Sequence, residues 1–164
     1  MTTITTAPSW PLRFIISVSL PLLVGGPAGW ATAQGVRDWY PALVKPPFNP
    51  PAWVFGPVWT LLYVLMGIAF FLVWRRVAAS PTARGALAAY GVQLFLNFLW
   101  SFLFFWARSP GWALVEILLL WLALGWTVVL FFRESRWAGW LMTPYLAWVT
   151  FAAVLNASIW FLNR

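Results

Sequence analysis

Five long apolar runs constrain this chain more than any other feature of its sequence. They cover residues 14–33, 53–74, 86–106, 112–132 and 140–162. Each run is close to the roughly 20 residues that a helix needs to cross the hydrocarbon of a bilayer. A membrane β-barrel would need segments of about 10 residues that alternate between apolar and polar, and the chain has none. We therefore predict an all-α, multi-pass integral membrane bundle of five transmembrane helices, forming a single domain over residues 1–164.

Composition and loop lengths support this prediction. Of the 164 residues, 63% are hydrophobic and 8% are charged, whereas about 25% of the residues in a soluble domain are charged. The first run is longer than the core of a signal peptide, which has about 7–15 residues, so we expect it to be retained as a helix. The connections after the second run are short, which predicts that consecutive helices are antiparallel neighbours.

The distribution of positive charge predicts an orientation and a class of partner. One set of six lies in the N-terminal segment and the second and fourth connections: Arg13, Arg75, Arg76, Arg84, Arg133 and Arg136. The other set has four members, which lie in the first and third connections and the C-terminal segment: Arg37, Lys45, Arg108 and Arg164. The excess favours N-in, C-out in a bacterial cell membrane. We attribute the net charge of +7 to contact with anionic lipid and not with nucleic acid, because no basic run is long enough to follow a phosphate backbone.

Missing residue types exclude several function classes. The chain has no Cys and no His, which excludes disulfides, thiol chemistry and imidazole ligation of zinc or haem. Its three acidic residues are Asp38, Glu116 and Glu134. A protease, a metal hydrolase or a proton-relay pump would need more polar groups than these. We therefore expect no metal site and no required cofactor.

Tryptophan is abundant, with fifteen copies. Those near the ends of the runs are explained by the preference of Trp for the headgroup level of a bilayer. Five lie deeper: Trp59, Trp100, Trp121, Trp126 and Trp148. These five either pack between helices or line a cavity for a flat apolar ligand, because aromatic rings supply a large contact area at fixed geometry.

The stretch KPPFNPPAWVFGPVWTLLY, residues 45–63, is rich in proline and aromatic residues. Its first four prolines favour a stiff, extended backbone, since proline fixes φ and lacks an amide hydrogen. Pro57 falls in the first turns of the second predicted helix, where a missing donor costs least. We expect the segment that contains these first prolines, residues 34–52, to fold over one end of the bundle as a lid.

Several blocks of residues occur in a fixed order along the chain. The first are Trp39-Tyr40, Leu43, Lys45-Pro46, Phe48, Pro50-Pro51, Trp53, Gly56 to Thr60 and Tyr63. The later ones are Gln93, Leu96-Asn97, Trp100, Phe104-Phe105, Gly111 to Glu116, Pro144 to Trp148, Phe151-Ala152 and Leu155-Asn156. Together these blocks resemble the TspO/MBR family, which includes the mitochondrial translocator protein (the peripheral benzodiazepine receptor) and the bacterial tryptophan-rich sensory proteins.

The resemblance implies five transmembrane helices, a homodimer, and a ligand pocket inside each bundle that the first long loop closes. Family ligands are porphyrins such as protoporphyrin IX and haem, sterols, and synthetic benzodiazepine-type and isoquinoline drugs. Some bacterial members are reported to degrade protoporphyrin IX in light. Carried over to this chain, the implied pocket residues are Trp39, Tyr40, Trp53, Phe55, Trp59, Tyr63, Asn97, Trp100, Trp112, Val115, Leu119, Trp148 and Ala152.

Helical spacing is compatible with this set. Trp59 and Tyr63 are four residues apart, so they share one helix face. Trp112, Val115 and Leu119 follow one another at spacings of three and four, so they share a face as well. The same spacings are expected wherever packed helices meet, and they do not by themselves separate a pocket from ordinary packing.

Three polar side chains, Asn97, Glu116 and Asn156, fall inside predicted helices, where such groups usually face the bundle interior. For Glu116, one interpretation is a carboxyl that is paired with a neighbouring helix or held protonated, and the other is a ligand or proton site. At the wet rim, Lys45 or Arg37 is expected to pair with a porphyrin propionate. Without His or Cys, haem lacks strong axial ligation, so the metal-free macrocycle is the preferred partner.

Three functions of different classes remain open. The first is a binding protein for porphyrins and similar flat hydrophobic ligands, with a regulatory or transport role in tetrapyrrole homeostasis. The second is a light-dependent enzyme that oxidises protoporphyrin IX, with Trp39 and Trp148 as redox-active neighbours. The third is a sterol-binding, lipid-binding or structural membrane protein. Sterol binding is disfavoured by the absence of a Tyr between Leu155 and Arg164, where animal members carry a sterol motif.

Small residues on the third predicted helix bear on the homodimer. Ala88, Ala89 and Gly91 would let two protomers approach closely, although such residues also pack within a single bundle. An ion-coupled carrier is the least favoured class, since the runs hold almost no ionisable groups and no clear inverted repeat.

Overall fold

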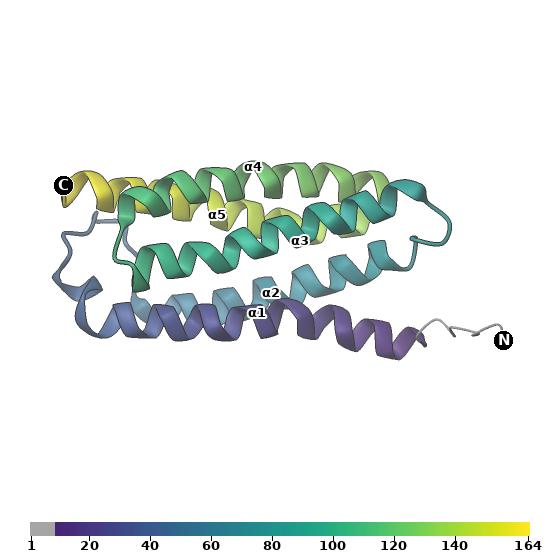
Figure 1. Ribbon diagram of the computed structural model, residues 1–164, viewed down its shortest axis with the longest axis horizontal. Helices are drawn as coiled ribbons and strands as arrows, with labels where there is room; N and C mark the ends of the chain where they lie inside the picture. The colour runs from purple at the N-terminus through teal and green to yellow at the C-terminus, as the bar shows by residue number, and fades with distance from the viewer. Residues whose placement is uncertain (1–8) are drawn as a thin grey trace.

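The computed structural model describes residues 9–164, and five long helices account for most of them (Figure 1). All five are long and apolar enough to cross a membrane. They are α1 (Trp10–Asp38), α2 (Ala52–Trp74), α3 (Pro81–Ser101), α4 (Pro110–Glu134) and α5 (Arg136–Leu162). Two short elements are the 3₁₀-helix η1 (Tyr40–Ala42) and the π-helical turn η2 (Phe102–Trp106), which continues α3. The predicted all-α bundle is confirmed, and the protein is a multi-pass integral membrane protein.

The helices form a closed ring. Consecutive helices run antiparallel, so α1 begins and α5 ends at opposite ends of the bundle (Figure 1). Around the ring, α1 packs on α2, α2 on α5, α5 on α4 and α4 on α3, and α1 contacts α3 and η2 to complete it. A ring of five helices leaves an interior that side chains must fill or leave open.

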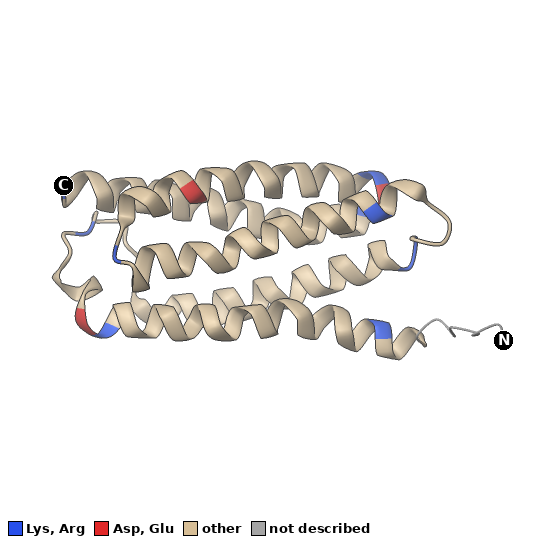
Figure 2. Ribbon diagram, viewed as in Figure 1, with Lys and Arg blue, Asp and Glu red and all other residues tan. Residues whose placement is uncertain are grey.

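Charged residues lie toward the two ends of the bundle, apart from one acidic residue inside α4, Glu116 (Figure 2). The outward faces between the ends are apolar, with side chains such as Leu23, Phe95 and Leu122 more than half exposed. This arrangement suits a hydrocarbon surrounding, in which exposed apolar side chains cost nothing and charges are expensive. The N-in, C-out orientation stays a prediction.

The first helix is longer than predicted. Its apolar run ends at residue 33, but α1 continues to Asp38, so the lid begins at Trp39 and covers residues 39–51. The last turns of α1 carry polar residues, and low hydropathy there does not mark the end of the helix. The helix also continues through Pro21 and Pro27, which membrane helices tolerate because neighbouring groups satisfy the freed carbonyls.

Gly67 allows α1 and α2 to pack backbone against backbone. A Cβ at this position would lie 2.5 Å from the Cα of Val18 and 2.7 Å from the carbonyl oxygen of Ser17. Helices in lipid gain little from the hydrophobic effect when they associate, so small residues that permit close approach contribute much of their attraction. The contact between α1 and α2 in the half of the bundle away from the lid therefore depends on Gly67.

Replacing Gly67 with Ala is expected to destabilise the bundle, because the added methyl group meets backbone atoms that have no alternative rotamer. Overpacking of this kind costs about 1–3 kcal/mol, and thermal unfolding of the detergent-solubilised protein measures the loss. The matched control is Gly125→Ala on α4, where an added Cβ meets no atom within 4 Å. Equal melting temperatures for the two variants would contradict the close α1–α2 packing.

Candidate ligand-binding site

A cavity of about 500 Å³ lies inside the bundle, in the half nearer the lid. All five helices contribute to its lining, and Tyr40 of η1 lines it from the lid. Most of the lining side chains are apolar. Both the volume and the lining are typical of a site for a small organic molecule, since such sites are concave, mostly apolar and about 300–1,000 Å³ in volume.

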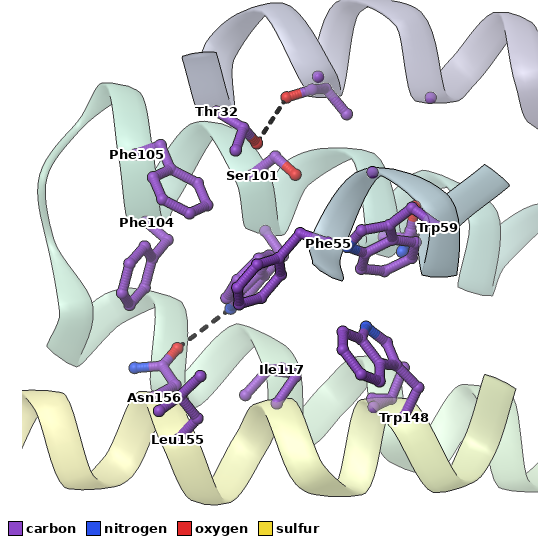
Figure 3. A pocket seen from close by; sticks show the side chains of 18 of the residues that line it. Thr32, Phe55, Trp59, Ser101, Phe104, Phe105, Ile117, Trp148, Leu155 and Asn156 are labelled. Atoms are coloured by element: carbon purple, nitrogen blue, oxygen red, sulfur yellow. Dashed lines mark hydrogen bonds between the residues drawn. The ribbon is translucent and has the colours of Figure 1, made fainter. Parts of the chain in front are cut away.

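Aromatic side chains form facing walls of the cavity (Figure 3). Phe55 and Trp59 come from α2, which lies across the cavity from Trp148 of α5. The rings of Phe55 and Trp148 meet edge to face with their centroids 5.9 Å apart, and Trp100 of α3 stacks on Phe104 of η2 at 5.1 Å. Because each ring is held by another ring, the cavity presents flat apolar surfaces at fixed orientations.

The polar groups of the cavity are hydrogen-bonded mainly to one another. The Tyr63 hydroxyl donates to Asn97 Oδ1 at 2.9 Å, and Trp100 Nε1 donates to Asn156 Oδ1 at 3.0 Å (Figure 3). Asn156 Nδ2 in turn donates to the carbonyl oxygen of Pro110 at 2.8 Å. Tyr63 uses one of the two lone pairs of the Asn97 oxygen, and the two N–H groups of Asn97 are its donors for a ligand.

The lid is clamped to the end of α5 by Asn163. The Val44 amide donates to Asn163 Oδ1 at 2.9 Å, and Asn163 Nδ2 donates to the Val44 carbonyl oxygen at 2.9 Å. A further bond from Asn163 Nδ2 to the carbonyl of Ile159, at 2.7 Å, fixes the amide on its own helix. One side chain therefore holds the middle of the lid at both backbone groups of Val44.

Tyr40 joins the lid to the cavity wall. Its hydroxyl donates to Asn49 Oδ1 at 2.6 Å, and its ring lies 5.8 Å from the ring of Phe105. Lys45 Nζ stands 4.9 Å from the centre of the Tyr40 ring, where a cation is attracted to the π-electrons. Burial raises the pKa of the Tyr40 hydroxyl above its usual value of 10, so this group stays neutral and able to donate at physiological pH.

The structure brings most of the predicted pocket residues together. Eight of them line the cavity: Tyr40, Phe55, Trp59, Tyr63, Asn97, Trp100, Trp148 and Ala152. They come from four separate parts of the chain: the lid, α2, α3 and α5. In these four parts the lining agrees with the pocket residues that the family resemblance implies. Direct ligand contact by these residues stays a prediction.

On α4 the prediction chose the wrong face. Trp112, Val115 and Leu119 are 70%, 52% and 53% exposed on the outside of the bundle and do not line the cavity. The residues of α4 that do line it are Ile117 and Leu120. A spacing of three and four identifies residues that share a face, but α4 is apolar on every side, so hydropathy does not reveal which face is inward.

Trp39 and Trp53 are also outside the cavity lining. Trp39 is half-buried and packs edge to face against Phe104, with ring centroids 5.6 Å apart, so it supports the wall from behind. Trp53, in the first turn of α2, is 75% exposed. Its position at the end of a transmembrane helix matches the interfacial role of Trp.

One wall of the cavity was not predicted. It is formed by the small residues of α1, including Gly25, Ala28, Gly29, Thr32 and Ala33. The concentration of small residues over positions 25–33 was the available signal, because small residues leave room beside a helix. Other lining residues absent from the prediction are Leu22, Val36, Ala52, Gly56, Thr60, Ser101, Phe104, Phe105, Ile117, Leu120, Val149, Phe151, Leu155, Asn156 and Ile159.

Glu116 is buried, with 5% of its surface exposed, and it does not line the cavity. Neither of its carboxyl oxygens has a hydrogen-bond partner among the described residues. The pairing with a neighbouring helix, one of the two forms of the first interpretation, is therefore not present among the described residues, and the protonated form stays a prediction. A proton or ligand role for Glu116 stays a prediction.

Comparison with known proteins gives one consistent result. The model of the TspO/MBR family matches residues 17–161. The chain is 41% identical to the tryptophan-rich protein TspO of Archaeoglobus fulgidus over 93% of its own length and 97% of that protein. It is 41% identical to the human translocator protein over 94% of this chain and 91% of the relative. It is 40% identical to the tryptophan-rich sensory protein of Cereibacter sphaeroides, over 85% of each chain.

Replacing Asn163 with Ala is expected to loosen the lid, because both hydrogen bonds to Val44 are lost. At a net contribution of about 0.5–1.5 kcal/mol for each of the two bonds, amide exchange at Val44 should accelerate about 5- to 150-fold. Hydrogen–deuterium exchange of the peptide that spans residues 39–51 measures this. The control is Ser158→Ala, whose hydroxyl bonds only within α5, to the Val154 carbonyl. An unchanged exchange rate in the Asn163 variant would show that the clamp does not hold the lid.

Proposed function

The chain belongs to the TspO/MBR family, and we propose that its cavity binds porphyrins and similar flat hydrophobic molecules, with a regulatory or transport role in tetrapyrrole homeostasis. The observation that carries the proposal is the set of aromatic rings from α2, α3 and α5 that line one cavity, above all Phe55, Trp100 and Trp148. Flat rings in fixed positions complement a flat conjugated ligand better than branched aliphatic side chains would. No cofactor is required in this proposal, since the porphyrin is the ligand.

Protoporphyrin IX fits this site better than haem. The chain has no His and no Cys, so neither an imidazole nor a thiolate is available to bind the iron. The cavity instead offers neutral donors, such as the Asn97 amide, to polar atoms of a metal-free ligand. We therefore infer that binding of the macrocycle rests on ring contacts and not on metal ligation.

The propionate groups of a porphyrin would lie at the lid. Lys45 Nζ makes hydrogen bonds to the carbonyl oxygens of Pro41 and Leu43, at 3.2 and 3.0 Å. These carbonyls are neutral, so the charge of Lys45 remains available for a carboxylate at the wet rim. Arg37, in the last turn of α1, is a second cation at the same end of the bundle.

A homodimer and a bacterial location remain part of the proposal. Ala88 and Gly91 are exposed on the outer face of α3 and Ala89 is half-buried, so small residues are accessible to a second copy of the chain. The proposed location is a bacterial cell membrane, with the N-terminus inside as the positive charges favour.

Light-dependent oxidation of protoporphyrin IX is a second candidate function. Trp148 supports it, because this oxidisable ring lies in the cavity wall. Trp39 does not reach the cavity. The reaction would need dioxygen as the oxidant, which takes up the electrons that the porphyrin loses. Illumination in air of the bound complex distinguishes this function: loss of porphyrin absorbance in the wild type and not in Trp148→Phe would favour the enzyme over the binding protein.

The test of porphyrin binding uses Ala152, a small residue of the cavity wall next to the aromatic rings. Ala152→Phe is expected to fill part of the cavity and to weaken protoporphyrin IX binding by about tenfold or more, equivalent to a loss of about 1.4 kcal/mol. A titration in the dark, followed by quenching of tryptophan fluorescence, measures the dissociation constant.

The matched control is Ala147→Phe, on the exposed side of the same helix, which should leave the dissociation constant unchanged. Saturable binding that both variants weaken equally would place the porphyrin outside the cavity. Linear, non-saturable quenching in the wild type would contradict porphyrin binding altogether and favour a sterol-binding, lipid-binding or structural role.

A further inference from the structure

The wall of the cavity is incomplete on one side only. Lining residues that are exposed on the outside of the bundle all belong to α1 and α2: Leu22, Gly29, Ala33, Ala52, Gly56 and Thr60. Every lining residue from α3, η2, α4 and α5 is buried or half-buried. The lining is therefore most exposed between α1 and α2, where the cavity reaches the surface, and it is better covered by side chains elsewhere around the ring.

The gap follows from the way these two helices pack. Away from the lid, α1 and α2 are in backbone contact at Gly67, and farther along, Gly25 of α1 lies against the ring of Tyr63. Beyond that point, toward the lid, an added Cβ at Gly29 or Gly56 would meet no atom within 4 Å. The two helices thus pack closely in one half of the bundle and leave open space beside small residues in the other half.

The rim of the opening is apolar. Its small residues, Gly29 and Ala33 on one helix and Gly56 on the other, carry no polar side chain. Thr60 donates its hydroxyl to the carbonyl of Gly56 at 2.9 Å, so it turns no unsatisfied donor toward the outside. Gly56 and Thr60 are the fifth and ninth residues of α2, so they lie about 6 and 12 Å below its first residue at 1.5 Å per residue. This depth reaches the hydrocarbon of the leaflet on the lid side.

The water-facing end of the cavity, by contrast, is covered. Asn163 holds Val44 through two hydrogen bonds, and Tyr40 packs against Phe105 beneath the lid. A ligand that came from water would have to break these contacts. A ligand already dissolved in the bilayer meets an opening with no polar group to displace.

We propose that the opening between Gly29 and Ala33 of α1 and Gly56 and Thr60 of α2 is a lateral portal, through which lipid-dissolved ligands pass between one leaflet and the cavity. The inference rests on the proposed function and extends it to a route and a ligand class. The ligands are flat, apolar molecules that partition into the membrane, and any carboxylates they carry stay at headgroup level near Lys45.

Bulky side chains at the two glycines of the portal test the proposal. Gly29→Phe and Gly56→Phe have open space for the new side chain, so the fold is expected to tolerate both. With protein in phosphatidylcholine vesicles that contain protoporphyrin IX, stopped-flow fluorescence in the dark is expected to show association and dissociation both slowed by about tenfold. Because a plugged portal obstructs passage in both directions, the association and dissociation rate constants are expected to fall together.

Two further variants make the result specific. Gly26→Phe lies on α1 outside the cavity lining and also has open space, and it should bind at the wild-type rate. Asn163→Ala, which loosens the lid, should also leave association unchanged.

Three outcomes would overturn the portal. Wild-type rates in both plugged variants would exclude passage between α1 and α2, and faster association in Asn163→Ala alone would assign the route to the lid. A raised dissociation constant with faster dissociation in both plugged variants would mean that the new rings occupy the cavity and do not block a route. Absence of saturable binding in the wild type would instead refute the proposed function itself, and the portal with it.

Discussion

A helix in hydrocarbon satisfies its backbone hydrogen bonds within itself, and the rest of this structure depends on how such helices can then approach one another. Lipid tails are as apolar as the side chains, so close packing decides which faces meet. Gly67 brings α1 and α2 into backbone contact in one half of the bundle. In the other half, small residues of α1 face large aromatic residues of α2, α3 and α5, and the interior stays partly open. One physical rule thus accounts for both the packed half and the hollow half.

Within the hollow half, the protein prepares the site before a ligand arrives. Buried polar groups are expensive unless they are paired, and here Tyr63 is paired with Asn97, and Trp100 with Asn156. These pairs fix the orientation of the rings without a ligand, so less conformational freedom is lost on binding. The proline-rich segment before α2 also reduces the conformational freedom lost on binding, because a stiff lid held at Val44 covers the site and has few alternative conformations.

The sequence predicted the architecture well and the lining of the cavity in part. Five apolar runs of suitable length leave little choice of fold, and their polar breaks lie near the observed loops. The site was predicted best on α2, α3 and α5, where Phe55, Asn97 and Trp148 do line the cavity. The face of α4 was wrong, because a helix that is apolar all round gives no signal of which side is inward. The α1 wall was missed since glycine and alanine define a cavity by the space they leave and not by what they contact.

The most direct test of the account is a crystal structure of the protein grown with protoporphyrin IX in the dark. The account predicts difference density for the flat macrocycle inside the cavity, in contact with the rings of Phe55, Trp100 and Trp148, with its propionates toward the lid. Density confined to the outer face of α4, beside Trp112 and Val115, or an unoccupied cavity at saturating porphyrin, would contradict it.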